Sequence, residues 1–203
     1  MDDQECVVLA DFYTDWIALL RVQLIGAGYA LRPEATEQDV SFAYFNVRKR
    51  SIDQVPRKVL RSAVLSCPDE CRAALEIIQS EAETGGNLNA HLSRTLLDSN
   101  YNDPLLNDWG IHHFHLGIAM ESDGFVERTG ALLFARITES SIYFIDVMKH
   151  GDWTRRRLLE ICIANWPELT ERYKLRGVLG LTTQITEEDT AKLWRRSPEK
   201  EAF

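Results

Sequence analysis

The chain has 203 residues, an apolar share of 45% and a formal net charge of −8. This length fits one large domain or two small ones, and the apolar share is sufficient for a hydrophobic core. The negative charge argues against a broad nucleic-acid-binding surface, because Lys and Arg contacts to phosphate supply much of the affinity of such surfaces, but it allows a local basic site.

Cysteine content and hydropathy predict a cytoplasmic protein that has no membrane partner. The sequence has no apolar run of the ~18 residues that a membrane span needs, and its first residues are acidic rather than basic as in a secretory signal. Cys6, Cys67, Cys71 and Cys162 do not form a dense disulfide pattern. Cys67 and Cys71 could be half of a zinc site, but no second half follows, so we expect buried or free thiols.

The first half of the chain is predicted to be rich in helix. Apolar residues recur at helical spacing from about residue 11 to 26, and a second helix should begin at Pro68 and end near residue 84. Residues 39–50 fit either a strand or a helix, and a helix or a mixed segment is favoured. Turn-forming residues crowd positions 98–104 and suggest a boundary between an α-rich region, 1–103, and an α+β domain, 104–203.

The second half of the chain is predicted to contain the sheet. Strands are expected at 111–118, 130–137, 142–148 and 178–182, the middle two as a hairpin. Helices are expected from Thr154 to about Asn165 and from a Thr186–Asp189 cap to Arg195. The predicted class is therefore α+β, in which the α-rich N-terminal part packs on an antiparallel sheet with flanking helices. Acidic side chains outnumber basic ones by 16 to 10 in residues 1–103 and by 15 to 13 in residues 104–203.

Three of the five histidines fall within positions 112–115. Side chains on a strand alternate between faces, so His113 and His115 should share one face, while His112 and Phe114 share the other. Two neighbouring imidazoles on a strand suit acid–base chemistry or metal binding. His150, directly after the hairpin, could be a third.

RNA cleavage through the 2′-hydroxyl needs a general base, a general acid and a cation, but no metal ion. The candidate catalytic residues are His113, His115 and His150 as titrating groups, with Arg128 and Arg136 as cations.

Two basic clusters could bind a phosphate or an RNA backbone, or could simply be solvated surfaces. One spans residues 48–61, and the other consists of Lys149 and residues 155–157. The predicted substrate-binding residues are Lys149, Arg155 and Arg156, together with Trp109, which could stack on a base or fill a core.

The segment 128–137, Arg-Thr-Gly-Ala-Leu-Leu-Phe-Ala-Arg-Ile, followed by 142–150, Ile-Tyr-Phe-Ile-Asp-Val-Met-Lys-His, resembles the central hairpin of RelE-type ribonuclease toxins. These toxins share a small sheet with barnase-like and EndoU-like ribonucleases. The resemblance covers about residues 110–150 and implies metal-independent RNA cleavage in a toxin or phage-defence setting. It implies His113 or His115 as base, His150 as acid or base, and Arg128 or Arg136 on the phosphate. The chain departs from such toxins in its greater length and its acidity. Residues 106–117 also resemble a segment of a widespread uncharacterised bacterial family, which implies no activity.

Three alternatives remain open at this point. His113, His115, His150 and Asp146 could bind zinc or iron, although no H-E-x-x-H motif is present. The protein could instead be an acidic immunity or antitoxin-like protein that binds a basic partner by charge complementarity. A toxin, by contrast, could have a cognate antitoxin as its partner. Finally, the histidines could be purely structural.

Overall fold

The computed structural model describes residues 11–149 and 156–173, together with 186, 188, 189 and 192. The chain divides into two compact units. The first comprises residues up to Ile52 and the segment Arg94–Asn102; the second comprises Asp53–Ser93 and the chain from Asp103 onward. Residues 53–93, which the sequence analysis placed in the N-terminal region, thus belong to the same unit as the sheet.

The first unit is built on two helices, α1 (Phe12–Gly26) and α2 (Glu37–Arg50). The helix predicted over 11–26 is confirmed, and the segment 39–50 is helical. α1 begins where the Asp11 carboxylate accepts a hydrogen bond from the Thr14 amide. α2 begins at a capping box in which the side chains of Thr36 and Asp39 each accept a bond from the other's backbone amide. The core of this unit consists of Ile17, Leu20, Leu24, Val40, Ala43 and Val47.

A buried arginine ties a short segment to α2. Arg50 is only 4% exposed, and its guanidinium donates to the carbonyls of Thr95, at 2.6 Å, and Asp98. Thr95 belongs to the 3₁₀ helix η3 (Arg94–Leu97). The side chain of Arg50 therefore stabilises the fold, although Arg50 belongs to a basic cluster that was predicted as a candidate phosphate-binding site.

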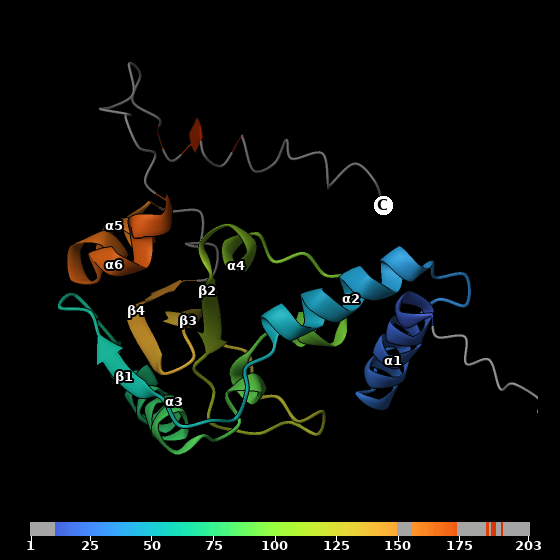
Figure 1. The fold of residues 1–203 in the computed structure, drawn as a ribbon. Coiled ribbons are helices and arrows are strands. Elements are labelled where there is room, and N and C mark those ends of the chain that lie inside the picture. Colours follow the sequence, from blue (N-terminus) through green and yellow to red (C-terminus); the bar gives the residue numbers. More distant parts are fainter. Residues whose placement is uncertain (1–10, 150–155, 174–185, 187, 190–191, 193–203) are drawn as a thin grey trace, which may run out of the picture. The chain divides into compact units, whose positions relative to one another are not determined.

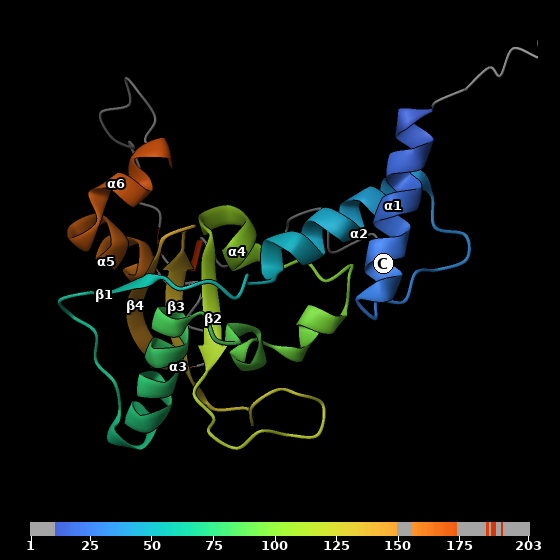
Figure 2. The same cartoon turned by 60° about the horizontal axis from the view of Figure 1, so that its bottom comes forward.

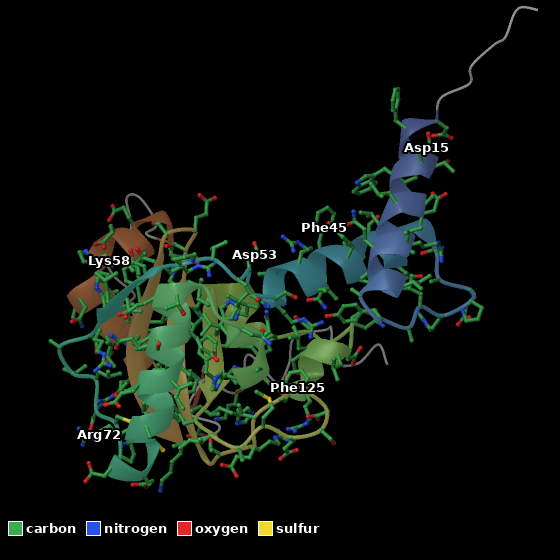
Figure 3. All side chains as sticks on the ribbon, turned by 90° about the horizontal axis from the view of Figure 1, so that it is seen from below. Asp15, Phe45, Asp53, Lys58, Arg72 and Phe125 are labelled. Carbon is green, nitrogen blue, oxygen red and sulfur yellow. The ribbon has the colours of Figure 1, made fainter. Side chains whose placement is uncertain are left out.

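Large apolar side chains remain exposed on both helices of the first unit: Phe12, Trp16 and Leu19 on α1, and Phe42 and Phe45 on α2. The Trp16 and Phe45 rings lie 6.1 Å apart, and Figure 3 labels Phe45 on α2. α1 is thus apolar on more than the face that it packs against α2.

The second unit contains a four-stranded sheet in the order β1-β4-β3-β2. Its strands are β1 (Lys58–Arg61), β2 (Ile111–His115), β3 (Ala131–Ile137) and β4 (Ser141–Lys149). The α+β class and the predicted hairpin are confirmed. The sheet is mixed rather than wholly antiparallel, because β1 runs parallel to β4. The predicted strand 178–182 lies outside the described residues.

A register shift between β3 and β4 interrupts the expected alternation of side chains. Phe134 pairs with Asp146 and Ala135 pairs with Phe144, so Ile145 is an additional residue on β4. As a result, Tyr143 packs against the same hydrophobic cluster as Met148, five residues further along β4. A regular strand would have put Tyr143 on the face opposite Asp146.

Helices cover both faces of the sheet. α4 (Pro104–Trp109) and α5 (Arg157–Asn165) bury one face through a cluster that includes Leu105, Ile111, Leu132, Phe134, Ile145, Leu158 and Ile161. α3 (Arg72–Thr84), preceded by the 3₁₀ turn η1 (Asp69–Cys71), lies on the other side of the sheet from α5 and α6 (Pro167–Thr170) (Figures 1 and 2). Because both faces are covered, β3 is buried almost throughout.

Some predicted elements fall partly outside the described residues. Thr154, the predicted helix cap, is one, and α5 begins at Arg157. Of the last predicted helix, the cap is present: Thr186 and Asp189 bond each other's backbone amides. In the described part of the chain, no helix is long and apolar enough to cross a membrane.

Candidate functional site

β2 places its histidines on opposite faces as the sequence predicts. His113 lies opposite Phe134, on the face covered by α4 and α5. His112 points the other way, and its ring stacks on that of Phe114 with centroids 6.3 Å apart and an interplanar angle of 28°. His113 and His115 therefore share a face, but their surroundings differ.

His115 is sealed in the interior, with only 3% of the residue exposed. Its Nδ1 accepts a hydrogen bond of 3.3 Å from the Thr129 amide, and its carbonyl oxygen lies 3.1 Å from Nδ1 of His91. His91 is itself buried, and its Nε2 lies 3.4 Å from a carboxylate oxygen of Glu81. These contacts connect β2, the 3₁₀ helix η2 (Leu88–His91) and α3. We assign His115 to the support of this region rather than to contact with a substrate, in contrast to the sequence-based expectation.

His113 keeps 20% of its side chain exposed, and its Nδ1 lies 4.0 Å from Oδ2 of Asp103. The same Asp103 is the N-cap of α4, where Oδ1 accepts a bond of 3.1 Å from the Leu106 amide. The sequence dictates this cap locally, since Asp103 precedes a proline at the first helical position. This separation is too long for a hydrogen bond, but a carboxylate so close stabilises the positive charge that the imidazole gains on accepting a proton.

Asp146, a metal ligand in the alternative hypothesis, accepts hydrogen bonds from two backbone amides and an arginine. Its Oδ1 accepts bonds of 2.9 Å from the amides of Ser66 and Val147, and its Oδ2 accepts a bond of 3.0 Å from Arg157. Within residues 11–149 and 156–173, no three His, Cys, Asp or Glu side chains form a group that could hold a metal ion. His150, another member of the predicted metal set and a predicted catalytic residue, lies outside the described residues.

A pocket of about 1100 Å³ lies at the end of the sheet where β4 ends and β3 begins. Thr129, Lys149 and Arg157 are among its lining residues. The Arg157 side chain is 55% exposed, although the carboxylate that it contacts is buried. Lys149, predicted to bind substrate, is thus joined here by Arg157, which belongs to the same predicted basic cluster but was not among the predicted substrate-binding residues.

The other predicted cations are spread over the second unit. Arg136 is 6% exposed, and its guanidinium lies over the Tyr173 ring, 5.6 Å from the centroid. Arg128 is exposed in the connection between β2 and β3. Arg156 faces Glu160 in the next turn of α5 at 3.7 Å, and Arg155 lies outside the described residues. The structure thus brings neither Arg136 nor Arg156 into the pocket.

Trp109 has a packing role. Its ring lies 5.4 Å from that of Tyr173, in the 3₁₀ helix η5 (Glu171–Tyr173), and it packs against the cluster under α4 and α5. The prediction that Trp109 binds a base is not supported by this position, whereas its alternative, a core tryptophan, fits it.

The described cysteines are poor nucleophiles. Burial raises the pKa of the Cys67 and Cys71 thiols and raises that of Cys162 to about 11. These thiols are therefore protonated at neutral pH, and the thiol form neither attacks an electrophile nor binds a metal ion efficiently.

Asp103 and Arg157 were not among the site residues predicted from the sequence, although Arg157 belonged to a predicted basic cluster. Asp103 was visible as a helix cap, but its approach to His113 depends on how α4 packs on β2. Arg157 was visible as one of three consecutive arginines, but the sequence offered no means of distinguishing it from Arg156. No protein-family model, curated protein or solved structure matches this chain.

Proposed function

We propose that the chain cleaves RNA without a metal ion, with His113 as the general base. The observation that carries the proposal is the Asp103 carboxylate 4.0 Å from Nδ1 of a histidine that is still partly exposed. In this arrangement a carboxylate lies beside the imidazole and stabilises the positive charge that the ring gains when it takes a substrate proton.

The reaction follows from these groups. His113 takes the proton of a 2′-hydroxyl, and the 2′-oxygen attacks the adjacent phosphorus and forms a 2′,3′-cyclic phosphate. The bond from phosphorus to the 5′-oxygen breaks, and that oxygen receives a proton from a general acid, for which the sequence proposes His150. Cations stabilise the additional negative charge on the phosphate in the transition state. We propose the cytoplasm as the compartment and a toxin or phage-defence role as the setting.

Neighbouring histidines on opposite faces of β2 provide a matched test. His113→Asn should lower the rate of RNA cleavage by about 100-fold or more, the usual contribution of a general base. His112→Asn, whose ring stacks on Phe114, should leave the rate within a few-fold of the wild type. Far-ultraviolet circular dichroism of both variants checks the fold. A His113→Asn protein that is folded and cleaves RNA at the wild-type rate would contradict the proposal.

A further inference from the structure

Arg157, the first residue of α5, is held in place by the buried carboxylate of Asp146. Asp146 is 3% exposed and uses one oxygen for two backbone amides and the other for Arg157, at 3.0 Å. The backbone bonds fix the carboxylate, and the carboxylate fixes one nitrogen of the guanidinium. Arg157 has further N–H donors, and its side chain lines the pocket that Lys149 also lines.

We propose that Arg157 and Lys149 bind a backbone phosphate of the RNA strand, next to but distinct from the phosphate that is cleaved. This inference rests on the proposed function for the identity of the strand. Arginine suits such a contact because its planar donors match phosphate oxygens, and anchoring by a buried carboxylate reduces the conformational freedom lost on binding.

The register of the sheet indicates that this phosphate is a second one. His113, Phe134 and Asp146 form one row across β2, β3 and β4. Neighbouring strands lie about 4.8 Å apart, so the backbones at His113 and Asp146 are separated by about 10 Å. The fully buried ring of Phe134 lies between them. His113 and Arg157, which bonds Asp146, thus belong to opposite ends of this row, and we assign them to successive phosphates of one strand.

The charges of the pocket favour a phosphodiester over a terminal phosphate group. Glu70 and Glu127 also line it, and their carboxylates oppose an anion. A phosphodiester carries a single negative charge, so it meets less repulsion than a terminal phosphate that carries nearly two. The site therefore fits an internal position of the strand better than its phosphorylated end.

Adjacent arginines allow a controlled test of binding. We would measure the affinity of a short, fluorescently labelled single-stranded RNA by anisotropy across a salt series, in a His113→Asn background that is not expected to cut the probe. Arg157→Gln should weaken binding several-fold and reduce the magnitude of the slope of log K against log salt by about 0.7, the value for one phosphate contact on a single strand. Arg156→Gln, which removes a side chain that faces Glu160, should change neither quantity appreciably.

Arg157→Lys guards against a folding defect, because it keeps the charge but loses the planar donors. It should retain the salt slope with an intermediate affinity. Equal affinities and slopes for Arg157→Gln and Arg156→Gln would overturn the inference. If RNA binding depends on Arg157 but the wild type does not cleave RNA, the phosphate site stands and the proposed function fails. If the wild type cleaves RNA and Arg157→Gln binds RNA as tightly as its parent, the proposed function stands and the phosphate site fails.

Discussion

At the scale of single residues, three histidines within four positions have three different environments. The strand period correctly separates His112 from His113. It does not separate His113 from His115, because burial depends on segments far away in the sequence: Thr129 and His91 enclose His115, and Asp103 lies beside His113. A sequence pattern predicts on which face a side chain lies, but not what covers that face.

The carboxylate beside His113 can be tested separately from the helix cap. Asp103→Asn should keep α4 intact, because Asn is as good an N-cap as Asp. It removes the negative charge that stabilises protonated His113, so we expect RNA cleavage to slow by at least about tenfold. Steady-state rates measure the effect, and a Leu106 amide that keeps its protection from hydrogen exchange shows that the cap persists. An unchanged rate in a correctly capped protein would argue that Asp103 has no part in the reaction.

Arginine burial is a second property that the sequence did not reveal. Arg57, like Arg50, looked like part of a basic surface, yet it is 8% exposed and donates to the backbone carbonyls of Asp53, Val55 and Thr138. In the sequence, a run of basic residues looks like a phosphate-binding surface whether its side chains point to solvent or are buried against backbone carbonyls of loops.

At the scale of elements, close approach of two backbones explains one glycine. A Cβ on Gly117 would lie 2.3 Å from the Glu127 carbonyl oxygen, whereas a Cβ on Gly130 would meet nothing within 4 Å. We expect Gly117→Ala to lower the free energy of unfolding by about 1–3 kcal/mol, the usual cost of overpacking. Gly130→Ala, in the same region, should leave it unchanged or raise it slightly. Urea unfolding of both variants provides the measurement, and equal effects would show that the chain adjusts at Gly117 without cost.

The capping box of α2 predicts a pH-dependent contribution to stability. Hydrogen bonds from the Thr36 amide and hydroxyl lower the pKa of Asp39 below its usual value of 3.8. A carboxyl whose pKa is lower in the folded state stabilises the fold above its unfolded pKa, and this stabilisation is lost as the pH falls through the folded value.

Asp39→Ala should therefore destabilise α2 at about pH 6, and by progressively less as the pH falls below the usual carboxyl pKa and the wild-type carboxyl takes up its proton. Helical circular dichroism during urea unfolding measures the difference, and Gln38→Ala is the control on the same helix. A difference between Asp39→Ala and the wild type that does not depend on pH would rule out this role for the ionised carboxylate.

Strand β1 shows why part of the sheet was missed. It has four residues with charged ends, Lys58 and Arg61 (Lys58 is labelled in Figure 3), and its partner β4 lies about eighty positions later in the chain. So short a segment shows no period in its hydropathy, and parallel strands are not joined by a tight turn that could be recognised in the sequence. The longer hairpin strands, joined by a tight turn, were predicted correctly.

At the scale of the whole molecule, the class and most of the elements follow from the sequence, but the division into units does not. The turn-rich segment at 98–104 predicted one domain boundary. In the structure, residues 53–93 belong to the second unit and Arg94–Asn102 belongs again to the first. Buried Arg50, which bonds the backbone of that segment, accounts for the return. Such long-range pairings of a cation with backbone carbonyls leave no local pattern.

Cleavage of an RNA oligonucleotide and its all-deoxy counterpart in the presence of excess EDTA tests the central claim most directly. Because the proposed nucleophile is the 2′-hydroxyl and no metal ion takes part, the RNA should be cut to products that end in a 2′,3′-cyclic phosphate, and the DNA should remain intact. Mass spectrometry of the products distinguishes these ends from other termini. RNA that stays intact in EDTA but is cut when zinc or iron is restored, or that stays intact under both conditions, would contradict the account.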